Sequence, residues 1–275
     1  SVAPHRTELC LKCHGANPVN AAAMPAATDG VHSYGSCENC HGAAEKWLSA
    51  HYSPSWRSLT AEQKADQYGL LPTKDLSKRT GVCAGCHVGE AGRDVDHKLI
   101  AAGHPALRFE MAAYHAEPLY VKHWVDKGYG PDQEAWLWAI GQVGTAKAAA
   151  ELTRARAEQA ANKLPGRDWP ELAEYSCFAC HQDITPVKNP PARVKRELAP
   201  APGSLPWNTW FYPLAAHLAA APGGSSWVCP SGPVSGVRAV DDLFRKGDRP
   251  SPKDAATQAA VSAATGAVVS CALMM

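Results

Sequence analysis

Apolar residues recur at helical spacing through the middle of the chain. The clearest pattern covers residues 131–164, where Trp136, Ile140 and Val143 form one stripe that small apolar residues extend. A proline–aspartate pair opens this stretch and Pro165–Gly166 closes it, as is typical of the two ends of a helix. The pattern predicts one long helix that packs against a neighbouring element.

A second stretch, residues 97–125, shows weaker helical periodicity. Leu107, Met111 and Tyr114 recur there at helical spacing, which predicts that this stretch is helical in part. No long stretch alternates apolar and polar residues as a half-buried strand does. Glycine and proline number 22 each, which is above average usage. We therefore expect a mainly α protein with extensive irregular loops.

Proline divides the chain into two regions. The proline-rich residues 186–206 are typical of an extended connection, so we expect a main domain over 1–206 and a packing or partner-contact region over 207–275. The last segment, 255–275, is uncharged but rich in alanine, serine and threonine. A membrane span needs about 20 strongly apolar residues, so this segment favours a packed helix. Any membrane contact is expected through this segment alone.

The charge balance of the chain and its first residues indicate which partners and which location to expect. Lys and Arg number 27, and Asp and Glu number 26. This balance gives no reason to expect nucleic acid or an anionic membrane as a partner. The chain opens Ser-Val-Ala-Pro, as a mature N-terminus does after a signal peptide is removed. We therefore expect an exported protein, either periplasmic or extracellular.

Eight of the ten cysteines fall into four copies of the pattern C-x-x-C-H. Two thiols at this spacing can both bond to the vinyl groups along one edge of a haem, and the adjacent histidine then binds the iron. A zinc site does not require a histidine after every second cysteine, and a redox dithiol occurs once. The repetition therefore predicts a multihaem cytochrome c fold with four covalently bound haem c groups, attached through Cys10, Cys13, Cys37, Cys40, Cys83, Cys86, Cys177 and Cys180.

The histidines of the four motifs are the predicted proximal iron ligands, namely His14, His41, His87 and His181. Eight other histidines are available for the sixth iron positions. Of the four methionines, Met274 and Met275 lie at the C-terminal end, so methionine cannot easily serve several haems. We expect mostly bis-His ligation, which gives lower reduction potentials than ligation by methionine.

Two of the candidate distal ligands, His97 and His104, lie seven residues apart. On a helix this spacing places both on one face, two turns apart, where they would reach two different haems. Gly103 and Pro105 would end such a helix near His104. The other candidates are His51, which follows a short helical stretch after the second motif, then His32 and His123, and finally His5, His115 and His217.

Four stretches around the motifs form a recognisable combination: Ser36–Gly42, Cys83–Val88, Asp96–Pro105 and Trp169–His181. Together they resemble the cytochrome c554-like family of tetrahaem and multihaem cytochromes, over roughly residues 30–215. The resemblance implies electron transfer in the periplasm, closely stacked haem pairs, and His97 and His104 as iron ligands. Family members often carry a histidine shortly after the first motif, whereas this chain has none from residue 15 to residue 20.

Three functions are compatible with these motifs. We expect an electron carrier with six-coordinate haems that exchanges electrons with redox partner proteins. An alternative is self-association into a homo-oligomer or a filament, in which head-to-tail contacts join copies of the chain. A reductase would need one open iron position and groups that deliver protons, and we name no catalytic residue. Cys229 and Cys271 lack the haem pattern, and a disulfide between them is expected in an oxidising compartment.

Overall fold

The computed structural model describes residues 7–15, 37–117, 132–181, 205–208, 232–245, 250–257 and 259. Within these ranges the chain forms helices and irregular loops and no β-strand. Two isolated β-bridges pair Glu90 with Arg93 and Tyr175 with Trp207. The predicted mainly α class is therefore confirmed for the described part of the chain.

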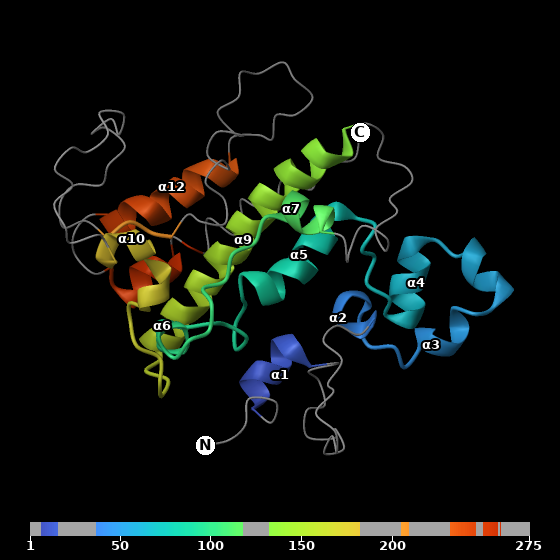
Figure 1. The fold of residues 1–275 in the computed structure, drawn as a ribbon, viewed down its shortest axis with the longest axis horizontal. Helices are drawn as coiled ribbons and strands as arrows, with labels where there is room; N and C mark the ends of the chain where they lie inside the picture. Colours follow the sequence, from blue (N-terminus) through green and yellow to red (C-terminus); the bar gives the residue numbers. More distant parts are fainter. Residues whose placement is uncertain are drawn as a thin grey trace.

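A long helix, α9 (Gln133–Ala161), runs through the centre of the molecule (Figure 1). It begins after Asp132 and ends before Asn162, so the helix predicted over 131–164 is confirmed to within a few residues. Its buried positions are not confined to one stripe, because several elements pack around it. This helix is the support on which the motif-bearing segments are arranged.

Helix α5 (Leu76–His87) carries the third motif and packs directly on α9. The side chain of Asp75 caps its first turn by accepting hydrogen bonds from two backbone N–H groups, at 2.9 and 3.1 Å. The two helices come close at Gly144 of α9, where an added Cβ would lie 2.5 Å from Cγ2 of Thr80. Glycine is needed here because any side chain would push α5 away from α9.

Helix α7 (Met111–Ala116) packs on α9 in the same way. A Cβ added to Gly141 would lie 2.5 Å from the Cβ of Met111, which is completely buried. The side chain of Glu110 caps α7 by accepting hydrogen bonds from the backbone N–H groups of its first turn. Because Gly141 and Gly144 have no side chains, α5 and α7 both pack close to the backbone of α9.

The expectation of one helix carrying both His97 and His104 is wrong. Helix α6 (His97–Ala101) is a single turn, and Gly103 then adopts a left-handed φ of 109° that redirects the chain. His104 therefore lies outside the helix, and the next helix starts only at residue 111. Gly103 ends the helix before the second histidine because only glycine adopts this conformation without strain.

Helix α12 (Gly232–Arg245) covers another side of α9 (Figure 1). Its Phe244 is buried against an aromatic cluster, with ring centroids 5.3 Å from Tyr175, 6.4 Å from Trp207 and 6.2 Å from Trp169. These residues belong to the same hydrophobic cluster as the apolar side chains of α5 and α9. The described residues after 206 thus pack on the main core.

The remaining helices of the N-terminal part are short. They are α1 (Glu8–His14), α2 (Cys37–His41), α3 (Trp47–Ala50), the 3₁₀ helix η3 (Pro54–Ser58) and α4 (Ala61–Tyr68). Figure 1 shows α2, α3 and α4 grouped at the end of the molecule far from α12. Within this group, α2, which carries the second motif, lies nearest to α5.

Several sequence expectations fall outside the described residues. They concern Cys229, Cys271, residues 186–204 and the greater part of 255–275. Within the described ranges, no helix combines the length and apolar character that crossing a membrane requires.

Candidate haem-binding site

Each C-x-x-C-H motif lies on a helical turn. Helices α1 and α5 end at His14 and His87, α2 spans the second motif, and α10 (Cys177–Cys180) carries the fourth, with His181 immediately after it. Residues i and i+3 of a helix share one face, so both cysteines of a motif point to the same side. All eight motif cysteines are free thiols, which leaves each of them available for a bond to a haem.

The first and third motifs contact each other through their cysteines. A hydrogen bond between the thiols lowers the pKa of Cys86 to about 7 and raises that of Cys13 above its ordinary value. Burial raises the pKa of the Cys83 thiol to about 12, and it also raises the pKa of Cys40. The charge of Cys86 further raises the pKa of Cys40, and the charge of Cys40 further raises the pKa of Cys83, so the second motif lies near the third.

Hydrogen bonds hold the first three motifs together as one group. In the loop after the third motif, the guanidinium of Arg93 donates to the Lys12 carbonyl at 3.3 Å, and the Lys12 ammonium donates to the Gly92 carbonyl at 3.2 Å. The side-chain amide of Asn39, inside the second motif, donates to the Gly15 carbonyl at 2.8 Å. These hydrogen bonds thus join the segment of the first motif to the segments of the second and third motifs.

His104 lies beside the first motif histidine. The ring centroids of His14 and His104 are 6.3 Å apart, with an angle of 62° between the ring planes. Nδ1 of His104 is 2.8 Å from the Pro105 carbonyl oxygen. A carbonyl only accepts, so Nδ1 is the protonated nitrogen and Nε2 keeps its lone pair. This is the arrangement of a histidine that binds a metal through Nε2.

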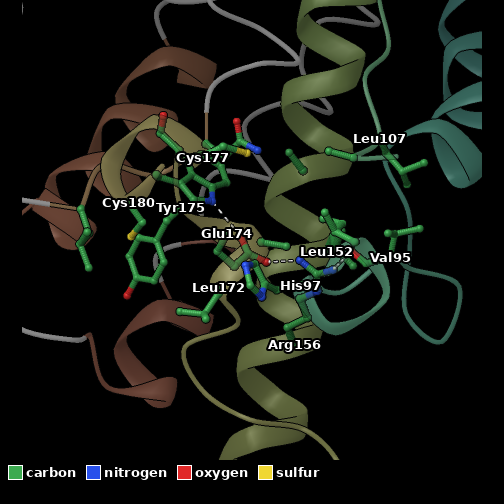
Figure 2. A pocket seen from close by; sticks show the side chains of 18 of the residues that line it. Val95, His97, Leu107, Leu152, Arg156, Leu172, Glu174, Tyr175, Cys177 and Cys180 are labelled. Atoms are coloured by element: carbon green, nitrogen blue, oxygen red, sulfur yellow. Dashed lines mark hydrogen bonds and ion pairs between the residues drawn. The ribbon is translucent and has the colours of Figure 1, made fainter. Parts of the chain in front are cut away.

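His97 lies beside the fourth motif histidine. The ring centroids of His97 and His181 are 6.4 Å apart and the ring planes are 26° from parallel. Both rings and both motif cysteines, Cys177 and Cys180, line one cavity of about 480 Å³ (Figure 2). This volume is in the range of cofactor sites, about 300–1,000 Å³. The cavity walls are mostly apolar and include Val88, Leu107, Leu152, Leu172, Tyr175 and Trp207.

The residues of these two sites fit a haem with two axial histidines. Metal–imidazole bonds are about 2.0–2.1 Å long and the ring centre lies about 1.1 Å behind the nitrogen, so two imidazoles on opposite sides of one metal would have centroids about 6.3 Å apart. The two observed separations, 6.3 and 6.4 Å, agree with this value. Within the described ranges, no three His, Cys, Asp or Glu side chains gather as ligands of a bare metal ion.

His51 is placed differently from His97 and His104. It ends α3, and its Nδ1 lies 3.2 Å from the Trp47 carbonyl and 2.5 Å from the Leu48 carbonyl. Among the described residues, its ring contacts are Trp47 and Tyr52. The structure therefore brings His51 to no motif histidine in the described ranges. The other expected ligands, His32 and His123, and the further candidates His5 and His217 lie outside these ranges.

Both ring nitrogens of His115 are engaged within the protein. Nδ1 lies 2.7 Å from the Met111 carbonyl, and Nε2 is 3.2 Å from a guanidinium nitrogen of Arg79, from which it accepts a hydrogen bond. Arg79 is itself almost completely buried, with 1% of its surface exposed. In this arrangement His115 has no lone pair left for iron.

Sequence analysis did not identify the aromatic residues around the third motif histidine. The ring of His87 contacts Phe109 and Tyr114, with centroid distances of 5.6 and 4.6 Å. Burial, and then the charge of His14, lower the pKa of His87 below its ordinary value. The neighbours of His87 are more than 20 residues away along the chain, so no local pattern identifies them.

A polar group on the wall of the fourth motif's cavity was also missed. Arg156 and Glu174 line this cavity and are both buried. No local signal identifies Arg156, because residues 151–158 of α9 also contain Glu151, Arg154 and Glu158. A buried arginine needs compensating partners, and those partners come from other segments.

Paired cysteines followed by an iron-binding imidazole, at a cavity of cofactor size, are the defining features of c-type cytochromes, which transfer electrons through covalently bound haem. Residues 36–106 match the model of the family of cytochrome c554 and c-prime. The match confirms the resemblance to this family over about a quarter of the chain, including the second and third motifs, His97 and His104. The wider span of residues 30–215 extends beyond this match on both sides. No curated protein and no solved structure matches the chain.

Proposed function

We propose that this protein is an electron-transfer cytochrome that carries four haem c groups, one for each C-x-x-C-H motif. The repeated motif supports the number four, and the free thiols on one face of each helical turn support the mode of attachment. The proximal iron ligands are then His14, His41, His87 and His181. Such a protein works outside the cytoplasm, as is typical of the matched family, and its partners are other redox proteins.

We further propose bis-His ligation, with His97 completing the haem of the fourth motif and His104 that of the first. The observation that carries this proposal is the cavity in which His97 lies 6.4 Å from His181 together with both motif thiols. His32, His51 and His123 remain the candidates from which we propose the distal ligands of the second and third haems come.

The residues of these sites are suited to electron transfer, in which no covalent bond is made or broken. When bound, haem iron supplies a reversible one-electron change. The imidazoles of His97 and His181 would hold the iron, and most of the other side chains that line their cavity are apolar. If the protein itself supplies both of these ligands, no position would be left for a substrate at this site. This favours a carrier over a reductase.

The mass of the purified protein tests the number of haems. We expect the mass of the polypeptide plus four haems, and a smaller number would contradict the proposal. Electron microscopy of the same preparation tests self-association, with discrete particles expected for a carrier and fibres for a filament subunit.

Carbon monoxide binding tests the axial ligands, because this gas binds reduced haem iron only where the sixth position is open. We expect little binding by the wild-type protein, and one additional binding site in each of the variants His97→Ala and His104→Ala. His115→Ala is the matched control, since both ring nitrogens of His115 are engaged within the protein. If His97→Ala binds no more carbon monoxide than His115→Ala, the assignment of His97 is wrong.

A further inference from the structure

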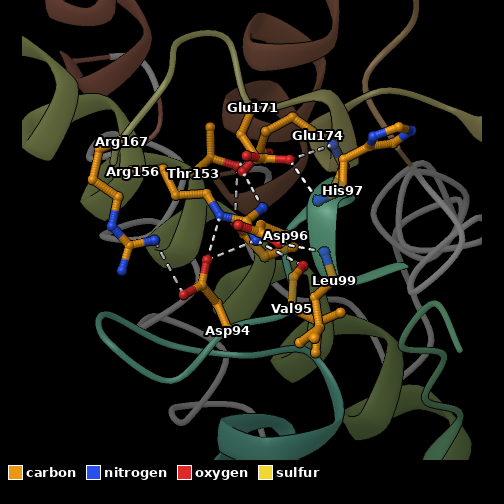
Figure 3. Close-up of polar contacts among 12 residues, drawn as sticks. Asp94, Val95, Asp96, His97, Leu99, Thr153, Arg156, Arg167, Glu171 and Glu174 are labelled. Atoms are coloured by element: carbon orange, nitrogen blue, oxygen red, sulfur yellow. Dashed lines mark hydrogen bonds and ion pairs between the residues drawn. The ribbon is translucent and has the colours of Figure 1, made fainter. Parts of the chain in front are cut away.

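A buried charged cluster lies against the fourth motif's cavity (Figure 3). At its centre, Arg156 donates hydrogen bonds to a carboxylate oxygen of Asp94 at 2.9 Å, to a carboxylate oxygen of Glu174 at 2.9 Å, and to the Val95 carbonyl at 3.1 Å. The side chains of Arg156, Asp94 and Glu174 are only 7%, 4% and 4% exposed. All three nitrogens of the guanidinium therefore have acceptors inside the protein.

The two carboxylates have further partners of their own. The second oxygen of Glu174 accepts from the Thr153 hydroxyl at 2.5 Å and from the Trp207 indole at 2.9 Å. The second oxygen of Asp94 accepts from Arg167 at 3.4 Å. Burial lowers the pKa of Arg156, but the charges and hydrogen bonds of Glu174 and Asp94 outweigh this effect, so the pKa lies above its ordinary value. The guanidinium of Arg156 and both oxygens of each carboxyl group thus have hydrogen-bond partners within the protein.

This cluster joins the two segments that carry the proposed axial ligands. Asp94 and Val95 lie immediately before α6, which begins at His97. Glu174 ends the 3₁₀ helix η4 (Leu172–Glu174), which leads into the fourth motif. Arg156 reaches both segments from α9, and the backbone N–H of His97 donates directly to the carboxylate of Glu171 at 2.8 Å.

Hydrophobic packing would stabilise the fold at least as well as this cluster. Replacing a buried ion pair by apolar residues of similar size is often neutral or stabilising. Apolar packing is not directional. Each hydrogen bond, in contrast, fixes the position of a donor relative to an acceptor. The cluster fixes the distance between the segment of His97 and the segment of His181, and that distance decides whether one iron can be held by both rings.

We infer that Arg156 is a positioning residue that holds His97 at its ligating distance from His181 and thereby keeps the sixth position of the fourth haem closed. The inference rests on the proposed function. It assigns to Arg156 no contact with iron and no part in the transfer itself. Arg156 acts only through the His97 segment and the Glu174 segment.

The test compares Arg156→Met with Arg154→Met in the haem-loaded protein. Arg154 lies on the same helix but, among the described residues, pairs only with Glu158 at the surface, and their side chains are 38% and 49% exposed. We expect four haems by mass in both variants. In Arg156→Met we expect one haem to bind carbon monoxide, with a shift in the reduction potential of one haem out of four. Arg154→Met should match the wild type in both measurements.

Two further variants keep the test decisive. Arg156→Lys retains the charge but not the fork of donors, and we expect carbon monoxide binding between that of the wild type and that of Arg156→Met. If Arg156→Met does not fold, Glu174→Gln replaces it, because it keeps the shape while removing one charge, and we expect it to open the same haem in part. Wild-type carbon monoxide binding in a folded Arg156→Met, or in Glu174→Gln, would overturn the inference.

The outcome is separable from failure of the proposed function. If the wild-type protein carries fewer than four haems, or if His97→Ala opens no site, the proposed ligation has failed and Arg156 has nothing to position. If His97→Ala opens a site and Arg156→Met does not, the ligation holds and only the role of Arg156 is wrong.

Discussion

The contact between α5 and α9 leads to a quantitative prediction at Gly144. An alanine here would place its Cβ 2.5 Å from Cγ2 and 3.1 Å from Cβ of Thr80, whose side chain is completely buried. Overpacking of this kind costs typically about 1–3 kcal/mol, whereas alanine in place of glycine in a helix recovers about 0.5–1 kcal/mol. We expect Gly144→Ala to lower the free energy of unfolding by up to about 2.5 kcal/mol, with about 1 kcal/mol as the central value.

Urea denaturation of the haem-loaded protein, with two companion variants, measures this effect. Gly81→Ala in α5 is the matched control, because its Cβ meets nothing within 4 Å; it should raise the free energy of unfolding by about 0.5–1 kcal/mol. Thr80→Ser removes Cγ2 but keeps the hydroxyl that donates to the Leu76 carbonyl at 2.8 Å, so it should relieve much of the loss when combined with Gly144→Ala. If Gly144→Ala is as stable as Gly81→Ala, the close approach of the helices is refuted.

Three more predictions follow from the described residues. Thr60→Ala should remove the N-terminal cap of α4, where the Thr60 hydroxyl accepts a hydrogen bond from a backbone N–H at 3.2 Å. It should lower the free energy of unfolding by about 1 kcal/mol. Amide hydrogen exchange should become faster in α4 alone, and unchanged exchange there would contradict the capping role. His104→Met should raise the potential of one haem, since methionine ligation favours the reduced iron; a redox titration without an upward shift would count against His104 as a ligand. In the haem-free chain at about pH 8, iodoacetamide should label Cys86 before Cys83, because their pKa values of about 7 and about 12 leave only the first largely deprotonated. Labelling of Cys86 should slow as the pH falls below about 7, and equal rates for the two cysteines at pH 8 would disprove the difference.

The features that the sequence predicted well are encoded by neighbouring residues. Each C-x-x-C-H motif contains both thiols and the imidazole within one helical turn, so its chemistry can be inferred from five residues. The long helix α9 was predicted because proline and aspartate precede it, Pro165–Gly166 follows it and apolar residues recur along it. Signals of this kind need no knowledge of the rest of the fold.

The features that it predicted poorly depend on long-range contacts or on one backbone angle. Seven-residue spacing suggested a helix from His97 to His104, but the left-handed φ of Gly103 ends it early. Arg156 finds its carboxylate partners 62 and 18 residues away along the chain. His97 and His104 likewise meet the motif histidines only through the tertiary fold, so the sequence named them as candidates without pairing them with particular motifs.

One short segment of the chain serves two sites, because His97 lies beside the fourth motif histidine and His104 beside the first. On the proposed ligation, inserting or deleting a single residue between them would carry one imidazole out of reach of its iron. The length of this segment is therefore fixed by two redox centres at once. Relatives that keep both centres should vary in length elsewhere, at exposed turns such as the one at Gly166, where φ is 73° and an added Cβ meets nothing.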